Sequence, residues 1–308
     1  MPFDIPFFDA HCDTLTQRNE PLRENHGHLD LIRLHEYRTA GQLFAVFVDS
    51  AGKTGEECFS LCRHYVERFQ RELAASGDIA TQCRTGGDIE RAFSENKTAA
   101  LLSVEGAEIL DCDPAKLREA EAWGVRAVNL TWNHANALSG TNAEEPERGL
   151  SARGRDFVRE AERRRILMDV SHLSEKGFWD LLEISERPVI ASHSNAKELC
   201  AHPRNLTDAQ ICALIENRGF IGLNVYAAFV GENPTMDAFV AHAEHMLSLG
   251  AEEVLGLGGD WDGCDSLAAG LTGIQDMPRL YEALYRRNYS EALLNKLFSG
   301  NLVRVLSV

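Results

Sequence analysis

The stretch AALLSVEG at residues 99–106 is the part of the sequence that decides the fold. Its almost entirely apolar run, from Ala99 to Val104, is typical of a strand covered on both faces, as in a parallel sheet. Glu105 follows directly, and a carboxylate at the end of a buried strand is costly unless it is paired. The stretch therefore predicts a parallel sheet with charged chemistry at the carboxyl ends of its strands.

Seven more short apolar runs recur along the chain, and segments with helical periodicity separate them. The eight predicted strands are residues 5–10, 43–48, 99–104, 127–130, 167–170, 189–191, 220–225 and 254–257. Eight strand and helix units favour a closed (β/α)8 TIM barrel, because an open doubly wound sheet usually stops near about six strands. We expect this barrel to form a single domain over residues 1–308.

The segments between the runs predict amphipathic helices, two of which begin after good capping residues, Ser174 and Thr207. His242 and His245 lie in one helix, and we interpret this pair as part of a solvated face. Cys58 and Cys62 lie in another, where buried thiols are favoured over a metal site. The predicted helices are residues 56–75, 114–123, 152–165, 175–186, 208–217, 236–249, 276–287 and 290–298, with a turn at 300–301.

Composition narrows the classes of partner. The chain has 47 acidic and 31 basic side chains and a formal net charge of −16, which disfavours binding to nucleic acid and to anionic membranes. The first residues lack the basic segment and the continuous apolar core of a signal peptide, and no apolar stretch is long enough to span a membrane. The eight cysteines are dispersed and are expected to be reduced thiols, so we expect a cytoplasmic protein.

Residues typical of metal ligands follow several of the eight runs. In a TIM barrel the carboxyl ends of all strands meet at one rim, so residues far apart in the sequence come together. His11 and Asp13 lie two apart, would point to the same side of a strand, and could hold one ion. In chain order, the polar residues at the predicted rim are His11, Asp13, Glu105, His172, His193 and Asp260.

Imidazole nitrogens and carboxylate oxygens form a ligand set that suits zinc without any thiolate. Glu105 has two carboxylate oxygens and could bridge two ions, as two-metal hydrolases require. Two alternatives stay open, since the histidines could be hydrogen-bonded core residues and Glu105 could reach solvent. Asp260 lies nearest to its strand and is the expected proton carrier, with Asp262 as the alternative.

The order and spacing of these motifs resemble the membrane dipeptidase (renal dipeptidase) family of zinc peptidases. The resemblance runs from about residue 7 to the Gly-Asn-Leu-Val-Arg-Val segment at residues 300–305. The motifs are His-x-Asp at 11–13, Ser-Val-Glu-Gly at 103–106, Asp-Val-Ser-His at 169–172, Ser-His-Ser at 192–194, Arg-Asn-Leu at 204–206 and Gly-Gly-Asp-x-Asp-Gly at 258–263.

This resemblance implies a dipeptidase with two Zn²⁺ ions per chain that acts on small dipeptides, including L,D-dipeptides. His11 and Asp13 would hold one ion, and Glu105 would bridge both. His172 and His193 would then hold the other ion.

The resemblance also implies residues that contact the substrate. Arg204 matches the arginine that receives the terminal carboxylate of the substrate, a task that suits the bidentate guanidinium group. Many family members carry histidine directly after Leu-Thr, where this chain has Trp132. His134, two residues later, could replace that substrate contact, and an ordinary exposed loop histidine is the alternative.

Our mechanistic hypothesis is that a hydroxide between the two zinc ions attacks the scissile carbonyl carbon. Asp260 would move the proton to the departing amine while Arg204 orients the substrate. One rival is another amide or lactone hydrolase, or a deaminase, on the same barrel, although those enzymes more often begin with His-x-His. A catalytically silent binding protein is the second rival, and a homodimer is the expected assembly.

Overall fold

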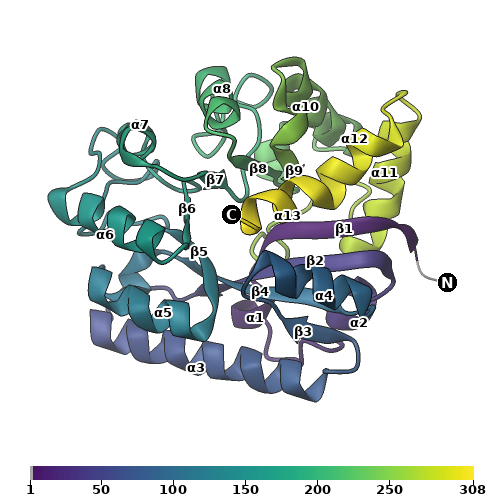
Figure 1. The fold of residues 1–308 in the computed structure, drawn as a ribbon. Coiled ribbons are helices and arrows are strands. Elements are labelled where there is room, and N and C mark those ends of the chain that lie inside the picture. Colours follow the sequence, from purple (N-terminus) through teal and green to yellow (C-terminus); the bar gives the residue numbers. More distant parts are fainter. Residues whose placement is uncertain (1–2) are drawn as a thin grey trace.

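Eight parallel strands close into a barrel in the computed structural model, which describes residues 3–308 (Figure 1). Neighbouring strands pair in order around the ring, β9 pairs with β1, and a pairing between β2 and β4 closes it. The predicted TIM barrel is therefore confirmed. Its strands are β1 (Phe3–Cys12), β2 (Tyr37–Phe47), β4 (Thr98–Glu105), β5 (Val125–Asn129), β6 (Leu167–Asp169), β7 (Ile190–Ala191), β8 (Phe220–Leu223) and β9 (Leu255–Leu257).

A ninth strand, β3 (Ala80–Gln82), lies outside this ring. It pairs with the first residues of β4, and β5 takes the same edge of β4 from Leu102 onward. The sequence analysis missed β3 because a strand of this length carries too few residues to show a pattern.

Helices separate the strands and cover the outside of the barrel (Figure 1). Both predicted caps are confirmed, because Ser174 accepts a hydrogen bond from the backbone N–H of Gly177 and Thr207 accepts one from that of Gln210. The α-helices are α1 (Thr14–Gln17), α2 (Leu31–Leu34), α3 (Gly55–Ala75), α4 (Gly86–Ser94), α5 (Leu117–Trp123), α6 (Ala152–Arg163), α7 (Glu175–Ile184), α8 (Asp208–Glu216), α9 (Ala227–Val230), α10 (Met236–Ser248), α11 (Met277–Tyr285), α12 (Glu291–Asn295) and α13 (Asn301–Leu306). Short 3₁₀ turns lie at Ala107–Leu110, Pro114–Lys116, Ala251–Glu253 and Ile274–Asp276, and a π-helical turn lies at Lys296–Gly300.

The prediction of a turn at residues 300–301 was wrong. Gly300 has helical backbone angles, so the π-helical turn continues directly into α13. The helix continues because Leu302, Val305 and Leu306 are buried among inward-facing strand residues. Burial of these apolar side chains outweighs the tendency of glycine to end a helix.

The prediction of a solvated face for His242 was also wrong. The side chain is fully buried on α10, where Nδ1 accepts a hydrogen bond from the backbone N–H of Ala196 at 3.1 Å. Its Nε2 lies 3.0 Å from the carbonyl oxygen of Val230. These two partners satisfy both ring nitrogens and make burial possible. His245 is partly exposed and pairs with Asp208 at 2.7 Å.

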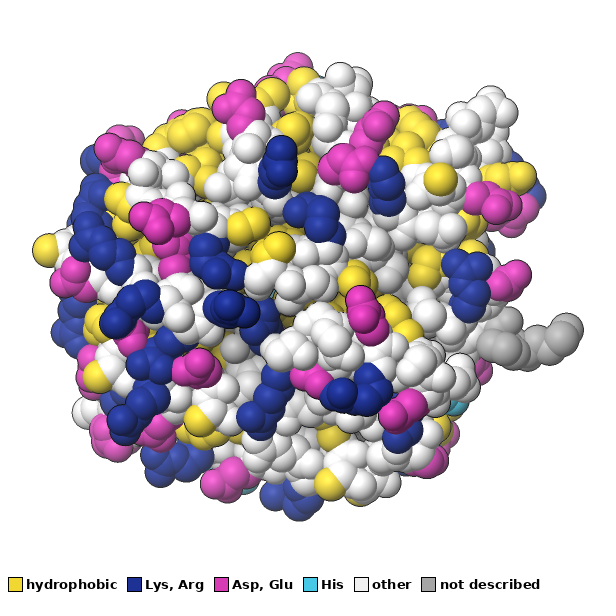
Figure 2. All heavy atoms as spheres, viewed as in Figure 1, with side chains coloured by type: hydrophobic (Ala, Val, Ile, Leu, Met, Phe, Trp, Pro, Cys, Tyr) yellow, Lys and Arg dark blue, Asp and Glu magenta, His cyan; other side chains and the backbone are white. Residues whose placement is uncertain are grey.

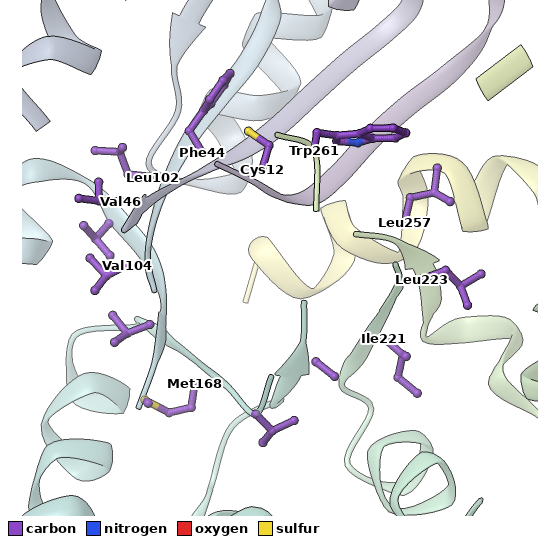
Figure 3. Close-up of a cluster of buried hydrophobic side chains, with 14 of the residues drawn as sticks. Cys12, Phe44, Val46, Leu102, Val104, Met168, Ile221, Leu223, Leu257 and Trp261 are labelled. Atoms are coloured by element: carbon purple, nitrogen blue, oxygen red, sulfur yellow. The ribbon is translucent and has the colours of Figure 1, made fainter. Parts of the chain in front are cut away.

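Two sets of apolar side chains pack on the two sides of the barrel wall. Figure 3 shows side chains such as Val46, Val104 and Leu223 pointing outward from their strands, toward the surrounding helices. A second cluster, which includes Phe8 and Phe220, fills the inside of the barrel near the amino ends of the strands, together with α13. The carboxyl end of the barrel interior is left to polar groups. No helix within residues 3–308 is long and apolar enough to cross a membrane.

Candidate metal centre and active site

A cavity of about 400 Å³ opens at the carboxyl ends of the strands. Its polar and aromatic lining comes from the last residues of strands and from the loops that follow them, as is usual for a TIM barrel. The lining residues are Asp13, Gln17, Phe47, Glu105, Trp132, Asn133, His172, His202, Arg204, Tyr226, Phe229, Asp260, Gly263, Cys264 and Asp265.

Glu105 ends β4 at the centre of this cavity, and its two carboxylate oxygens face different partners. Oε1 lies 3.0 Å from Nε2 of His172 and 3.7 Å from Nε2 of His193. Oε2 lies 3.7 Å from Nε2 of His11, which is itself 3.5 Å from Oδ2 of Asp13. The structure therefore brings together all five residues that the sequence indicated as ligands, in two groups on either side of one carboxylate.

Asp13 reaches this centre by a route that the sequence analysis did not foresee. β1 ends at Cys12, and Asp13 stands at the start of α1 with backbone angles outside the strand region. The alternation of side chains along a strand is therefore not what places His11 and Asp13 on the same side. A turn after the strand does this instead.

Hydrogen bonds orient the two imidazoles beside Oε1 of Glu105. Nδ1 of His172 lies 2.9 Å from Oδ1 of Asn133, and Nδ1 of His193 lies 2.7 Å from Oγ of Ser192. With Nδ1 engaged, Nε2 of each ring points into the centre, and the two Nε2 atoms lie 3.1 Å apart. Metal-binding histidines are commonly held in this way through their second nitrogen.

The centre carries more acidic than basic groups, and this excess of carboxylates fits bound cations. Burial lowers the pKa of both His172 and His193 well below the ordinary value, so both rings are neutral donors. Burial opposes a charge on His11, but Glu105, Asp13 and Asp260 together raise its pKa to about 10. Burial also raises the pKa of Glu105 well above its usual value. Three carboxylates thus surround one imidazole in a site shielded from water.

Several buried polar atoms of the centre have no hydrogen-bond partner. They include Nδ1 and Nε2 of His11 and Oδ1 of Asp13. Buried polar atoms are nearly always paired, so these atoms indicate that a ligand belongs here. Nitrogen and oxygen donors at this spacing fit divalent metal ions, and two groups of three residues lie close enough to hold one: His11, Glu105 and His193, and His11, Asp13 and Asp260.

Asp260 follows β9 and faces the same centre. Its Oδ1 lies 3.9 Å from Nε2 of His11, and its Oδ2 accepts a hydrogen bond from Nδ2 of Asn224 at 3.0 Å. Burial raises the pKa of Asp260. The backbone of Asp260 has a φ of 58°, in the left-handed region, which turns the chain sharply at the strand end.

Asp262, the alternative proton carrier, is engaged elsewhere. Its fully buried carboxylate accepts hydrogen bonds from Nε and Nη2 of Arg18 at 2.9 and 2.8 Å, and from Oγ1 of Thr14 at 2.6 Å. The backbone N–H of His28 donates to the same group at 2.9 Å. Asp262 does not line the cavity, and these contacts tie it to the segment between β1 and β2.

Arg204 lies deep in the cavity wall with most of its surface buried. Nε and Nη2 have no hydrogen-bond partner, and the guanidinium carbon lies 5.5 Å from the ring centre of Phe229. Burial lowers the pKa of Arg204 to about 10, although the charges of Asp260 and Glu105 oppose this shift. A buried guanidinium with free donors is suited to receive a carboxylate.

His134 is not among the residues that line the cavity. Its half-exposed ring lies 2.9 Å from a carboxylate oxygen of Glu144. Trp132 lines the cavity instead, with its ring centre 4.6 Å from that of Phe47. The structure thus brings Trp132, and not His134, to the cavity.

Sequence reasoning missed the residues that support the centre. Asn133 and Ser192 orient the rings of His172 and His193, and Asn224 holds Asp260. Phe47 and Tyr226 form parts of the cavity wall. Asn133 and Ser192 stand next to residues that the sequence analysis had singled out, so adjacency was an available signal. Asn224 and Phe47 carried no such signal, because both lay inside predicted strands, at residues 220–225 and 43–48.

A TIM barrel with a buried cluster of imidazoles and carboxylates at its carboxyl rim defines a class of metal-dependent hydrolases. Over residues 3–308, the sequence matches the model of the membrane dipeptidase family (peptidase family M19), and the chain belongs to this family. It is therefore a metal-dependent peptide hydrolase of the dipeptidase type.

Individual relatives agree with this assignment. The dipeptidase tcpJ of Claviceps purpurea is 32% identical, over 97% of this chain and 73% of that protein. An uncharacterized dipeptidase of Schizosaccharomyces pombe is 29% identical, over 98% of this chain and 80% of that protein. A metallopeptidase from Rhodobacter sphaeroides, solved with a phosphinate mimic of the dipeptide L-Ala-D-Ala, is 27% identical with a TM-score of 0.90, and the match covers 99% of each chain.

Proposed function

We propose that this protein is a two-zinc dipeptidase in which Glu105 bridges the two ions. The observation that carries the proposal is the arrangement around this carboxylate, with His172 and His193 at Oε1 and His11 at Oε2. Asp13 completes the second group beside His11. Donor atoms beside both oxygens of one carboxylate are what a pair of neighbouring cations needs.

Divalent ions at this position would polarise the scissile carbonyl group and make a water molecule acidic enough to attack at neutral pH. Asp260 is the proposed proton carrier, because Oδ1 faces the centre while Asn224 holds Oδ2. Its raised pKa suits a group that must accept a proton and release it to the departing amine.

Arg204 is the proposed binding residue for the terminal carboxylate of the substrate. Its two unpartnered nitrogens can donate to both oxygens of a carboxylate, which fixes the substrate relative to Glu105. The cavity of about 400 Å³ leaves room for a short peptide only. L,D-dipeptides are included among the proposed substrates because the Rhodobacter relative binds a mimic of L-Ala-D-Ala.

The test begins with the metal. Protein treated with a chelator should lose hydrolysis of a panel of L,L- and L,D-dipeptides, and added Zn²⁺ should restore it with two ions per chain by elemental analysis. Activity that is indifferent to the chelator would reject the proposal. Glu105→Gln should lower kcat by at least about 1,000-fold, because it removes a ligand of both ions. Retained turnover in this variant would remove the bridging role.

A further inference from the structure

Five arginines surround α13 at the amino end of the barrel, opposite the active site. Arg126 lies in β5, while Arg165, Arg187 and Arg218 lie just before β6, β7 and β8, and Arg304 lies on α13. We call these five residues the arginine rim. Figure 2 shows lysine and arginine side chains gathered toward the middle of the molecular face on which the chain ends in Figure 1.

The strand register places three of these arginines close together. Ala127 is paired with Leu167, so Arg126 lies at the level of Ile166, and Arg187 stands three residues before Ile190, the residue of β7 that pairs with Asp169. Backbones two strands apart are separated by about 10 Å. Arg165 lies between them, one residue further toward the amino end.

Within residues 3–308, no guanidinium nitrogen of the rim lies within 4.0 Å of a carboxylate oxygen, although the chain carries a net charge of −16. Other arginines nearby do form ion pairs, because Arg159 pairs with Asp156 at 3.1 Å and Arg163 pairs with Glu160. The Nε atoms of Arg126, Arg187 and Arg304 are buried without any hydrogen-bond partner. The three side chains are half-buried, so each of these Nε atoms is shielded from water although it lacks a hydrogen-bond acceptor.

Backbone carbonyl groups hold part of the rim in place. Nη2 of Arg126 donates to the carbonyl oxygen of Leu306 at 3.1 Å, and Nη1 of Arg304 donates to that of Arg218 at 2.8 Å. Burial and the charges of Arg187 and Arg165 lower the pKa of Arg126, and Asp88 offsets this only in part. Arg126 and Arg304 are thus held in place by the backbone, while Arg165 and Arg218 are exposed.

We propose that the arginine rim binds a phosphate group, either free or carried by a small molecule, at the amino end of the barrel. Phosphate suits the site because guanidinium groups bind its oxygens through planar pairs of N–H donors. A doubly charged anion would also relieve the repulsion among Arg126, Arg165 and Arg187. This site shares no residue with the proposed dipeptidase centre, so either proposal can fail alone.

The test compares thermal unfolding of the full chain in inorganic phosphate and in glycerol 3-phosphate with unfolding in chloride at the same ionic strength. We expect a saturable rise in Tm with at least one of the two phosphates, and the tighter probe identifies the source of the group. Arg165→Gln together with Arg187→Gln should weaken binding by at least about tenfold. In chloride, this double variant should unfold at the same or a higher temperature, because like charges have been removed.

The matched control is Arg279→Gln with Arg286→Gln at α11, two exposed arginines that pair with carboxylates of the same segment and lie outside the rim, and this variant should respond to phosphate as the unchanged protein does. Dipeptide hydrolysis should be retained in both double variants. The proposal is overturned if neither phosphate raises Tm above its value in chloride at the same ionic strength. It is equally overturned if the Arg165→Gln and Arg187→Gln variant keeps the full response, since the anion would then bind at the metal centre or elsewhere.

Discussion

Asp260 and Asp262 are two residues apart, yet their surroundings give the two carboxylates different tasks. Asp260 faces His11 and holds a single hydrogen bond from Asn224. We expect Asp260→Asn to lower kcat by about 100- to 10,000-fold, because the amide cannot carry a proton. KM and metal content should change little, since the amide oxygen keeps the shape of the site. Steady-state kinetics measures kcat and KM, and elemental analysis measures the metal content.

Asp262→Asn provides the comparison for that experiment. The carboxylate binds Arg18, Thr14 and the backbone of His28, so its neutralisation should lower the free energy of unfolding by about 1–3 kcal/mol. Part of Arg18 is exposed, which keeps the loss in the lower part of that range. If Asp262→Asn lost turnover and Asp260→Asn kept it, the assignment of the proton carrier would be reversed.

His242, which lies outside the active site, makes the stability of the folded protein depend on pH. Burial lowers its pKa below 6.5, so the folded state keeps the ring neutral while the unfolded chain binds a proton near pH 6.5. This residue therefore contributes stability above about pH 6.5, and the contribution is lost as the pH falls below that value. Urea unfolding at pH 7.5 and 5.5 measures the loss.

His242→Gln is the matched variant, because its amide can still donate to the carbonyl oxygen of Val230. It should be less stable than the unchanged protein by about 1–3 kcal/mol at pH 7.5, where the N–H of Ala196 loses its acceptor. The difference should shrink at pH 5.5. An equal difference at both pH values would show that His242 does not titrate on unfolding.

At the scale of elements, the predictable strands are those buried on both faces. β4 and β8 are continuous apolar runs, which the sequence shows directly. α4 was missed although Thr85 and Asp88 form a capping box at its start, because the signal is local and the helix is short. α13 was missed because Gly300 stands directly before it and indicated the end of a helix. The burial of its apolar side chains inside the barrel is visible only in the structure.

α13 fills the amino end of the barrel, and its removal from the core should be costly. Leu302 is 1% exposed among inward-facing strand residues. Leu302→Ala should lower the free energy of unfolding by about 2–5 kcal/mol through the lost contacts and the cavity that remains. Leu61→Ala, at a side chain that is 36% exposed on α3, should cost no more than about 1 kcal/mol. Equal losses in chemical denaturation would argue against the buried role of α13.

At the scale of the whole molecule, the proposed metal ligands could be singled out because each stands within three residues of the end of an apolar run, and a barrel brings such residues to one rim. Asn224 was missed because the predicted strand at residues 220–225 included it, whereas β8 ends at Leu223 and Asn224 follows directly at the rim. The single domain, the homodimer and the cytoplasmic location stay predictions. None of these depends on the contacts within the barrel.

The proposed ions should also stabilise the fold as a whole. Without them, Glu105, Asp13 and Asp260 are three buried carboxylates around one charged imidazole, that of His11, and their repulsion opposes folding. Ions that bind only the folded state add about 4 kcal/mol when present at about 1,000 times their Kd. For a chain of this size, chelation should therefore lower Tm by at least about 5 °C in differential scanning calorimetry, and Zn²⁺ should restore it. Glu105→Gln should show a smaller change, since it has lost a shared ligand. The same Tm with and without the chelator would mean that no ion holds these strands together.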